Sequence, residues 1–121
     1  MNTDQIIKEE SENIKSNDRF LMVPKKLFED ETYKEMTAEA KLLYSLMLDR
    51  LSLSENNGWH DKNGKVYIYY TQNAICEILG CRTQKAASVL NELEKQYHLI
   101  RRKRQGCGFP NKIYVHSLFS E

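Results

Sequence analysis

Four consecutive basic residues, from Arg101 to Arg104, are the feature of this sequence with the clearest chemistry. They open the stretch "RRKRQGCGFPNKIYV", in which a glycine-rich segment separates the basic run from aromatic and β-branched residues. Arginine and lysine bind phosphate through charge-assisted hydrogen bonds, so a cluster of them favours a polyanionic partner. The candidate phosphate-binding residues are Arg101, Arg102, Lys103, Arg104 and Lys112.

Two other interpretations of this basic run are a disordered charged patch and a guard on an exposed sheet edge. Residues typical of strands flank the run on both sides, which argues against disorder. Edge protection needs only one or two charges. Side chains alternate between the two faces of a strand, so four successive basic residues place two on each face. Such a pattern is tolerable where the end of a hairpin projects beyond the body of the protein, and we therefore expect a basic β-hairpin.

The charge of the chain is unevenly distributed. Between Arg82 and Lys112 there are eight basic residues against two acidic ones, which is a net charge of +6. The whole chain carries a net charge of +1, so the remainder carries −5. Charge concentrated in one contiguous third indicates a basic face and argues against indiscriminate binding of polyanions.

A second candidate site is the polar face of the helix expected after Gly80. Glutamine and asparagine can pair with adenine, lysine favours guanine or phosphate, and serine bonds either kind of group. Residues near the start of such a helix usually reach the base edges. Any solvent-exposed helix face is polar, so a single glutamine or lysine there is not evidence of a binding site. The whole set of polar residues, on the second helix of a helix-turn-helix, favours contact with DNA. The set comprises Arg82, Thr83, Gln84, Lys85, Ser88 and Asn91.

No arrangement of residues suggests catalysis or metal binding. The sequence lacks the motifs of serine hydrolases, zinc proteases and phosphate-binding loops. The three cysteines form no C-x-x-C pair, and the three histidines have no ligand spacing with them. We expect no enzyme, no cofactor and no metal site. The polar start contains no signal-peptide core and no apolar run is long enough to span a membrane, so we expect a cytoplasmic protein without a membrane partner.

The elements that position these residues follow from local patterns. Thr37 is a good N-cap for a long helix with apolar residues at helical spacing, and "VYIYY" (66–70) predicts a short strand. Thr71 caps a helix of about two turns that ends at Gly80, and a third helix runs over 82–99. The glycine-containing turn between the last two helices predicts a helix-turn-helix. With the hairpin, this order predicts a mostly helical α+β fold, a winged helix-turn-helix with three core helices and a C-terminal β-hairpin wing.

The N-terminal region divides at Asp18. Residues 1–18 are polar and predict a flexible arm, while residues 19–121 predict one DNA-binding domain. Pro24 favours an edge strand or an extended segment over a helix before it. The apolar residues Phe20, Leu21 and Met22 are candidates for a dimer interface, because helix-turn-helix proteins commonly bind two-fold sites as dimers.

The aromatic residues offer a weaker alternative. A row of exposed rings can stack on the bases of single-stranded nucleic acid, although strand aromatics at alternate positions are more typical of a core or an interface. The residues in question are Trp59, Tyr67, Tyr69, Tyr70, Phe109 and Tyr114.

Several stretches together resemble the N-terminal domain of the RepA_N replication initiators, from plasmids of Gram-positive bacteria. They are "FLMVPKKLFED", "TAEAKLLYSLMLDRLSLS", "NGWHDKNGKVYIYYT", "QKAASVLNELE" and "LIRRKRQGCGFPNKIYV". The resemblance covers about residues 19–118, and the combination of motifs is more specific than a generic winged helix.

The resemblance implies a dimeric winged-helix domain that recognises repeated double-stranded DNA sequences (iterons) in a plasmid origin. It also implies a separate C-terminal domain in the full initiators, through which replisome proteins could be recruited. Two other functions stay open: a winged-helix transcriptional repressor, and a winged-helix module for protein–protein contact. Five phosphate contacts from the wing would make log affinity fall against log salt with a slope of about −4 to −5 per protomer.

Overall fold

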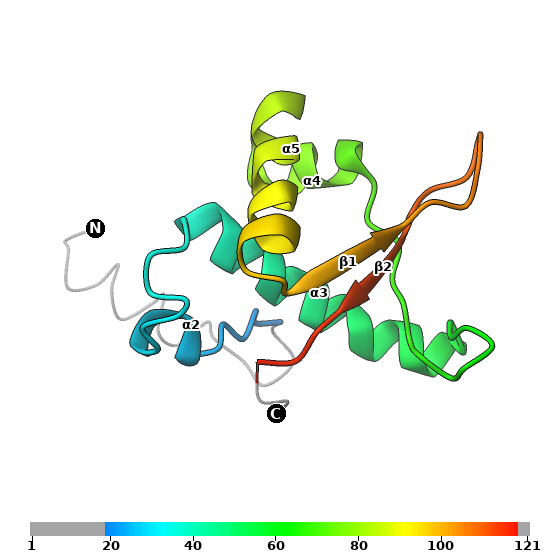
Figure 1. Cartoon of the computed structure of the whole chain (residues 1–121), viewed down its shortest axis with the longest axis horizontal. Coiled ribbons are helices and arrows are strands. Elements are labelled where there is room, and N and C mark those ends of the chain that lie inside the picture. The colour runs from blue at the N-terminus through cyan, green and yellow to red at the C-terminus, as the bar shows by residue number, and fades with distance from the viewer. Residues whose placement is uncertain (1–18, 119–121) are drawn as a thin grey trace, which may run out of the picture.

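The structure of the protein is a computed structural model, and it describes residues 19–118. Over this range, four helices, one π-helical turn and one hairpin follow in chain order (Figure 1). They are α2 (Lys26–Glu29), α3 (Ala38–Asn57), α4 (Gln72–Leu79), α5 (Thr83–Asn91), the π turn η1 (Glu92–Gln96), β1 (Ile100–Lys103) and β2 (Lys112–Val115). The predicted arm, residues 1–18, lies outside the described residues.

Helix α3 begins where its capping residue predicts. The Thr37 hydroxyl accepts a hydrogen bond from the N–H of Ala40 at 3.2 Å, which satisfies one of the amides left free in a first helical turn. Ala40, Leu43, Tyr44 and Met47 are buried along one face. This spacing of three and four residues is the reason that one side of α3 packs into the core.

Helices α4 and α5 form the predicted helix-turn-helix. The Thr71 side chain accepts from the N–H of Ala74, and Gly80 ends α4 with φ 64° and ψ 40°. This left-handed conformation is unfavourable for a residue with a Cβ atom, so glycine permits the abrupt turn. The Gln72 side-chain amide donates to the Thr83 carbonyl at 3.2 Å and ties the start of α4 to the first turn of α5.

The third predicted helix differs in its second half. Its α-helical part ends at Asn91, and Glu92–Gln96 form a π turn. Glu92 bonds to the backbone and hydroxyl of Thr37 at 2.8 and 2.7 Å, whereas Glu94 bonds to Arg102. The two carboxylates of this wider turn are therefore held by different elements, α3 on one side and β1 on the other.

Strands β1 and β2 form the predicted antiparallel hairpin. The register pairs Ile100 with Val115 and Lys103 with Lys112. The prediction of a strand over 66–70 is wrong in extent, because that segment forms only isolated bridges. Ile68 exchanges two backbone hydrogen bonds of 2.9 Å with Ile113, so the β-forming residues add a single pair to the edge of β2.

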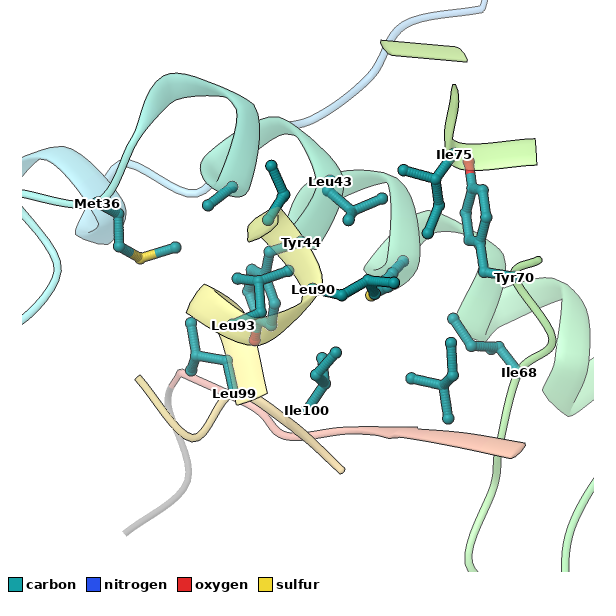
Figure 2. Close-up of a cluster of buried hydrophobic side chains, with 14 of the residues drawn as sticks. Met36, Leu43, Tyr44, Ile68, Tyr70, Ile75, Leu90, Leu93, Leu99 and Ile100 are labelled. Carbon is teal, nitrogen blue, oxygen red and sulfur yellow. The ribbon is translucent and has the colours of Figure 1, made fainter. Parts of the chain in front are cut away.

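The core lies where α3, α4, α5 and the hairpin meet (Figure 2). Tyr44 is fully buried at its centre, and its hydroxyl donates to the carbonyl of His116 just after β2. Burial raises the pKa of Tyr44 from its ordinary value of 10 to about 12, so the hydroxyl is harder to ionise and stays a donor even in mildly alkaline solution. This bond joins the longest helix to the end of the hairpin.

Residues 19–23 form neither helix nor strand, as expected of an extended segment, but the one-turn helix α2 was not predicted. Leu27 is the buried residue of this turn. Its burial against the core explains why four residues hold a helical conformation that would be unstable alone.

Candidate nucleic-acid interface

The exposed face of α5 carries every residue predicted for base contact. The side of the helix that packs into the core contributes Ala86, Val89 and Leu90. The predicted contact residues all lie on the exposed side, or just before the helix in the case of Arg82: Arg82, Thr83, Gln84, Lys85, Ser88 and Asn91. All six side chains are exposed, and two of them, Lys85 and Asn91, also contact other elements of the protein.

Lys85 is engaged on the protein itself. Its ammonium group lies 3.4 Å from the Glu39 carboxylate in the first turn of α3, and both side chains are 43% exposed. The pKa of Glu39 is lowered, first by a hydrogen bond from its own backbone and then by the Lys85 charge. An ion pair with this exposure contributes little to stability, so Lys85 can exchange Glu39 for a DNA group at small cost.

The basic residues of the hairpin divide between its two faces. Alternation puts Arg101 and Lys103 on one face of β1 and Arg102 on the other. The predicted alternation stops there, because β1 ends at Lys103 and Arg104 lies in the loop. Arg102 pairs in register with the buried Ile113, on the side of the helices, and its side chain is partly buried. Arg101, Lys103 and Lys112 lie on the opposite face, which we call the outer face of the wing.

Arg102 is held by the end of α5, the recognition helix of the helix-turn-helix, and by the π turn that follows it. Its guanidinium donates to Glu94 Oε1 at 2.7 Å and to Asn91 Oδ1 at 3.0 Å, and its backbone N–H donates to Glu94 Oε2 at 2.9 Å. Burial pushes the pKa of Glu94 up, but the hydrogen bonds and charge of Arg102 outweigh it and leave the pKa below the ordinary value. These bonds couple the wing to α5, and they occupy Nε and one terminal nitrogen of the guanidinium.

Tyrosine rings support two cations of the outer face. The Arg101 guanidinium lies 4.3 Å from the centre of the Tyr114 ring, and Lys112 Nζ lies 4.6 Å from the centre of Tyr67. Tyr67 contacts both Tyr69 and Tyr114 edge to face. The tyrosines are thus packed against one another and under cations, and this arrangement disfavours their use as an open stacking platform.

The wing ends in a projecting loop. Figure 1 shows the loop between β1 and β2 reaching away from the helices, on the side toward which the start of α5 also points. Arg104, Gln105 and Phe109 lie in this loop, and Phe109 is 68% exposed. Gly106 and Gly108 have φ of 113° and 84°, conformations that suit glycine.

The acidic partners Glu39, Glu92 and Glu94 were not identified from the sequence. In the sequence, the acidic residues between Arg82 and Lys112 counted only as a reduction of the net charge of that segment. Glu39 pairs with Lys85, Glu92 with Thr37 and Glu94 with Arg102. Each pair joins two different elements, so the spacing along the chain carries no local signal.

Among residues 19–118, no group of three or more histidines, cysteines or carboxylates is placed to hold a metal ion. Nor does that part of the chain contain a helix long and apolar enough to cross a membrane.

A helix-turn-helix followed by a basic hairpin that packs on the same core defines a winged-helix domain. The family model for the N-terminus of replication initiator protein A (RepA) matches residues 19–121, and the chain belongs to that family. Over 102 residues, 29% of positions are identical to those of a "41 kDa protein" of Lactobacillus helveticus, in a match that covers 79% of this chain. The chain spans only 29% of the length of that curated relative.

Solved structures give the same fold. An "N-Terminal domain of DNA binding protein" and a "Structure of Rep-DNA complex" each show a TM-score of 0.70 and 32% identity, covering 97% of this chain and 82% of theirs. A "Structure of MDR initiator" shows a TM-score of 0.69 and 30% identity, covering 97% of this chain and 84% of that one. These matches confirm the predicted family and the predicted winged-helix fold.

Proposed function

We propose that this chain is the DNA-binding domain of a plasmid replication initiator and that it recognises repeated double-stranded sequences in a plasmid origin. The observation that carries the proposal is the pairing of an exposed polar recognition helix with a basic wing coupled to it through Arg102. Membership of the RepA N-terminal family and the similar Rep–DNA complex support the same function.

In this proposal the two elements have different tasks. The exposed face of α5 enters the major groove, where Gln84, Lys85 and Ser88 near its start contact base edges. The wing contacts the backbone through the four cations that Glu94 does not hold: Arg101, Lys103, Arg104 and Lys112. At about −0.9 per phosphate, these four give a salt slope of about −3.6 from the wing, which is less steep than the slope of about −4 to −5 expected from five contacts.

We further propose that the domain binds as a homodimer and that residues 20–22 contribute to the contact between copies. Phe20 is 65% exposed and Met22 is 84% exposed, which is costly for apolar side chains in water. Both residues line a groove of about 430 Å³ together with Leu48 of α3. A second protomer that covers this surface would remove these apolar side chains from water.

The remaining parts of the proposal concern catalysis, cofactors, cellular location and protein partners. The domain binds DNA without catalysing a reaction or using a cofactor, and it acts in the cytoplasm, where a plasmid origin is found. Recruitment of replisome proteins belongs to a region outside this chain, in keeping with the greater length of its curated relative.

The test is quantitative binding of the 121-residue chain to duplexes from the origin of its own plasmid. Fluorescence anisotropy over a range of salt concentrations should give a log–log slope of about −3.6 or steeper, and a scrambled duplex should bind more weakly. A salt-independent affinity would refute the proposal. Footprinting then separates initiation from repression, because protection of tandem repeats at the origin supports the former and a lone palindrome over a promoter indicates the latter.

A further inference from the structure

A cleft of about 370 Å³ lies between the turn that follows α3 and the outer face of the wing. The turn contributes Lys62 and Asn63, and the hairpin contributes Lys103, Lys112 and Tyr114. The segment that links α3 to α4 passes along the hairpin on its way to α4 (Figure 1), and its bridge to β2 through Ile68 fixes that course.

Three ammonium groups surround this cleft without a matching set of carboxylates. Lys103 and Lys112 lie directly opposite each other in the hairpin, an arrangement of like charges that destabilises a pair of strands. Within residues 19–118, Lys62, Lys103 and Lys112 form no ion pair. Lys112 contacts the Tyr67 ring instead. An anion in the cleft would relieve the repulsion among them.

Among the residues that the structure describes, Asp61 is the one carboxylate that lines the cleft, and hydrogen bonds already compensate its charge. Its Oδ1 accepts from the N–H groups of Asn63 and Lys65 at 2.9 and 3.0 Å, and its Oδ2 accepts from the Tyr114 hydroxyl at 2.9 Å. The hydrogen bond from the Lys65 backbone is the largest of several effects that lower the pKa of Asp61. Asp61 therefore fixes the turn against the wing and holds Lys62 beside the hairpin.

We propose that this cleft binds a backbone phosphate of duplex DNA and that Lys62, outside the helix-turn-helix and the wing, is a DNA contact. The inference rests on the proposed function. The chemistry is that of a phosphate group, and duplex DNA is its source because the outer face also carries Arg101 and the loop that follows β1 carries Arg104. With Lys62 added to the four free wing cations, the expected salt slope becomes about −4.5.

The experiment compares Lys62→Ala with Lys34→Ala in the 121-residue chain, using the anisotropy assay on origin and scrambled duplexes. Lys34 is an exposed lysine between α2 and α3 that lines neither the cleft nor the neighbouring groove beside Arg101, which makes it the matched control. Lys62→Ala should make the slope less steep by about 0.9 and weaken binding to both duplexes by the same factor, whereas Lys34→Ala should leave the slope unchanged. Lys62→Arg should restore the slope.

Two outcomes overturn the inference and are distinguishable from failure of the proposed function. If the wild-type chain binds DNA and Lys62→Ala retains the full slope with a native circular dichroism spectrum, Lys62 contacts no phosphate. If NMR shows shifts of the Asn63 amide with inorganic phosphate but none with duplex DNA, the cleft takes a free anion instead. A wild-type chain that binds no DNA at all overturns the proposed function and this inference together.

Discussion

Replacement of Arg102 by alanine tests how the wing is coupled to the recognition helix. The guanidinium makes two hydrogen bonds, at 2.7 Å to Glu94 and at 3.0 Å to Asn91. The Arg102 and Glu94 side chains are only 26% and 16% exposed, so solvent screens their ion pair incompletely. The Arg102→Ala variant keeps the hydrogen bond from the backbone N–H to Glu94 Oε2 but leaves Glu94 Oε1 without its charged partner.

The expected cost follows from these contacts. A hydrogen bond to a charged group contributes about 1.5–3 kcal/mol, and the remaining exposure of both side chains places the loss of unfolding free energy near 2 kcal/mol. Denaturant titration followed by circular dichroism measures it, and for a domain of this size the melting temperature should fall by roughly 10 °C. Arg102→Lys should recover only part of the loss, because lysine cannot reproduce the fork of two donors.

Binding assays on the same variants separate a positioning role from phosphate contact. Arg102→Ala should weaken binding to every duplex several-fold while the salt slope stays unchanged, because the wing loses its orientation but no phosphate contact. Lys103→Ala is the matched control on the outer face and should do the reverse, with a slope less steep by about 0.9 and a stability change within about 0.5 kcal/mol. The reasoning is refuted if Arg102→Ala unfolds like the wild type and loses one unit of slope.

Four further outcomes follow from the structure. Lys85→Ala should reduce discrimination between origin and scrambled duplexes in competition binding, whereas equal loss on both would place Lys85 on phosphate. Gly80→Ala should lower the unfolding free energy by about 1–2 kcal/mol, since alanine is strained at φ 64°; an unchanged midpoint in denaturant would contradict this. Met22→Ser should shift sedimentation toward the monomer, and an unaltered profile would exclude residues 20–22 from the interface. The pKa of Glu94 is lower folded than unfolded, so its contribution is present above the ordinary value of 4.5 and is lost as pH falls through the folded pKa. The stability difference between wild type and Arg102→Ala should therefore shrink below about pH 4.5 in acid denaturation, and a constant difference would argue against this linkage.

The start of α3, both limits of α4 and the existence of the hairpin were predictable from the sequence alone. Thr37 and Thr71 accept hydrogen bonds from amides three residues ahead, and Gly80 supplies a left-handed cap. Each of these effects acts within one turn of chain, so residue type and spacing suffice to predict it. The apolar spacing of α5 likewise showed which of its faces would be exposed, and with it the candidate base contacts.

The tertiary structure alone decided which of the charged residues are free. Arg102 and Lys103 are neighbours of the same charge, yet one is held by Glu94 and the other faces the cleft beside Lys62. The segment 66–70 has strand-forming residues, but only Ile68 reaches a partner strand. The sequence by itself determined the elements and the basic character of the wing, because those depend on local geometry and composition. The division of its cations between positioning and binding depends on contacts between distant segments, and these exist only once α3, η1 and the hairpin have packed together.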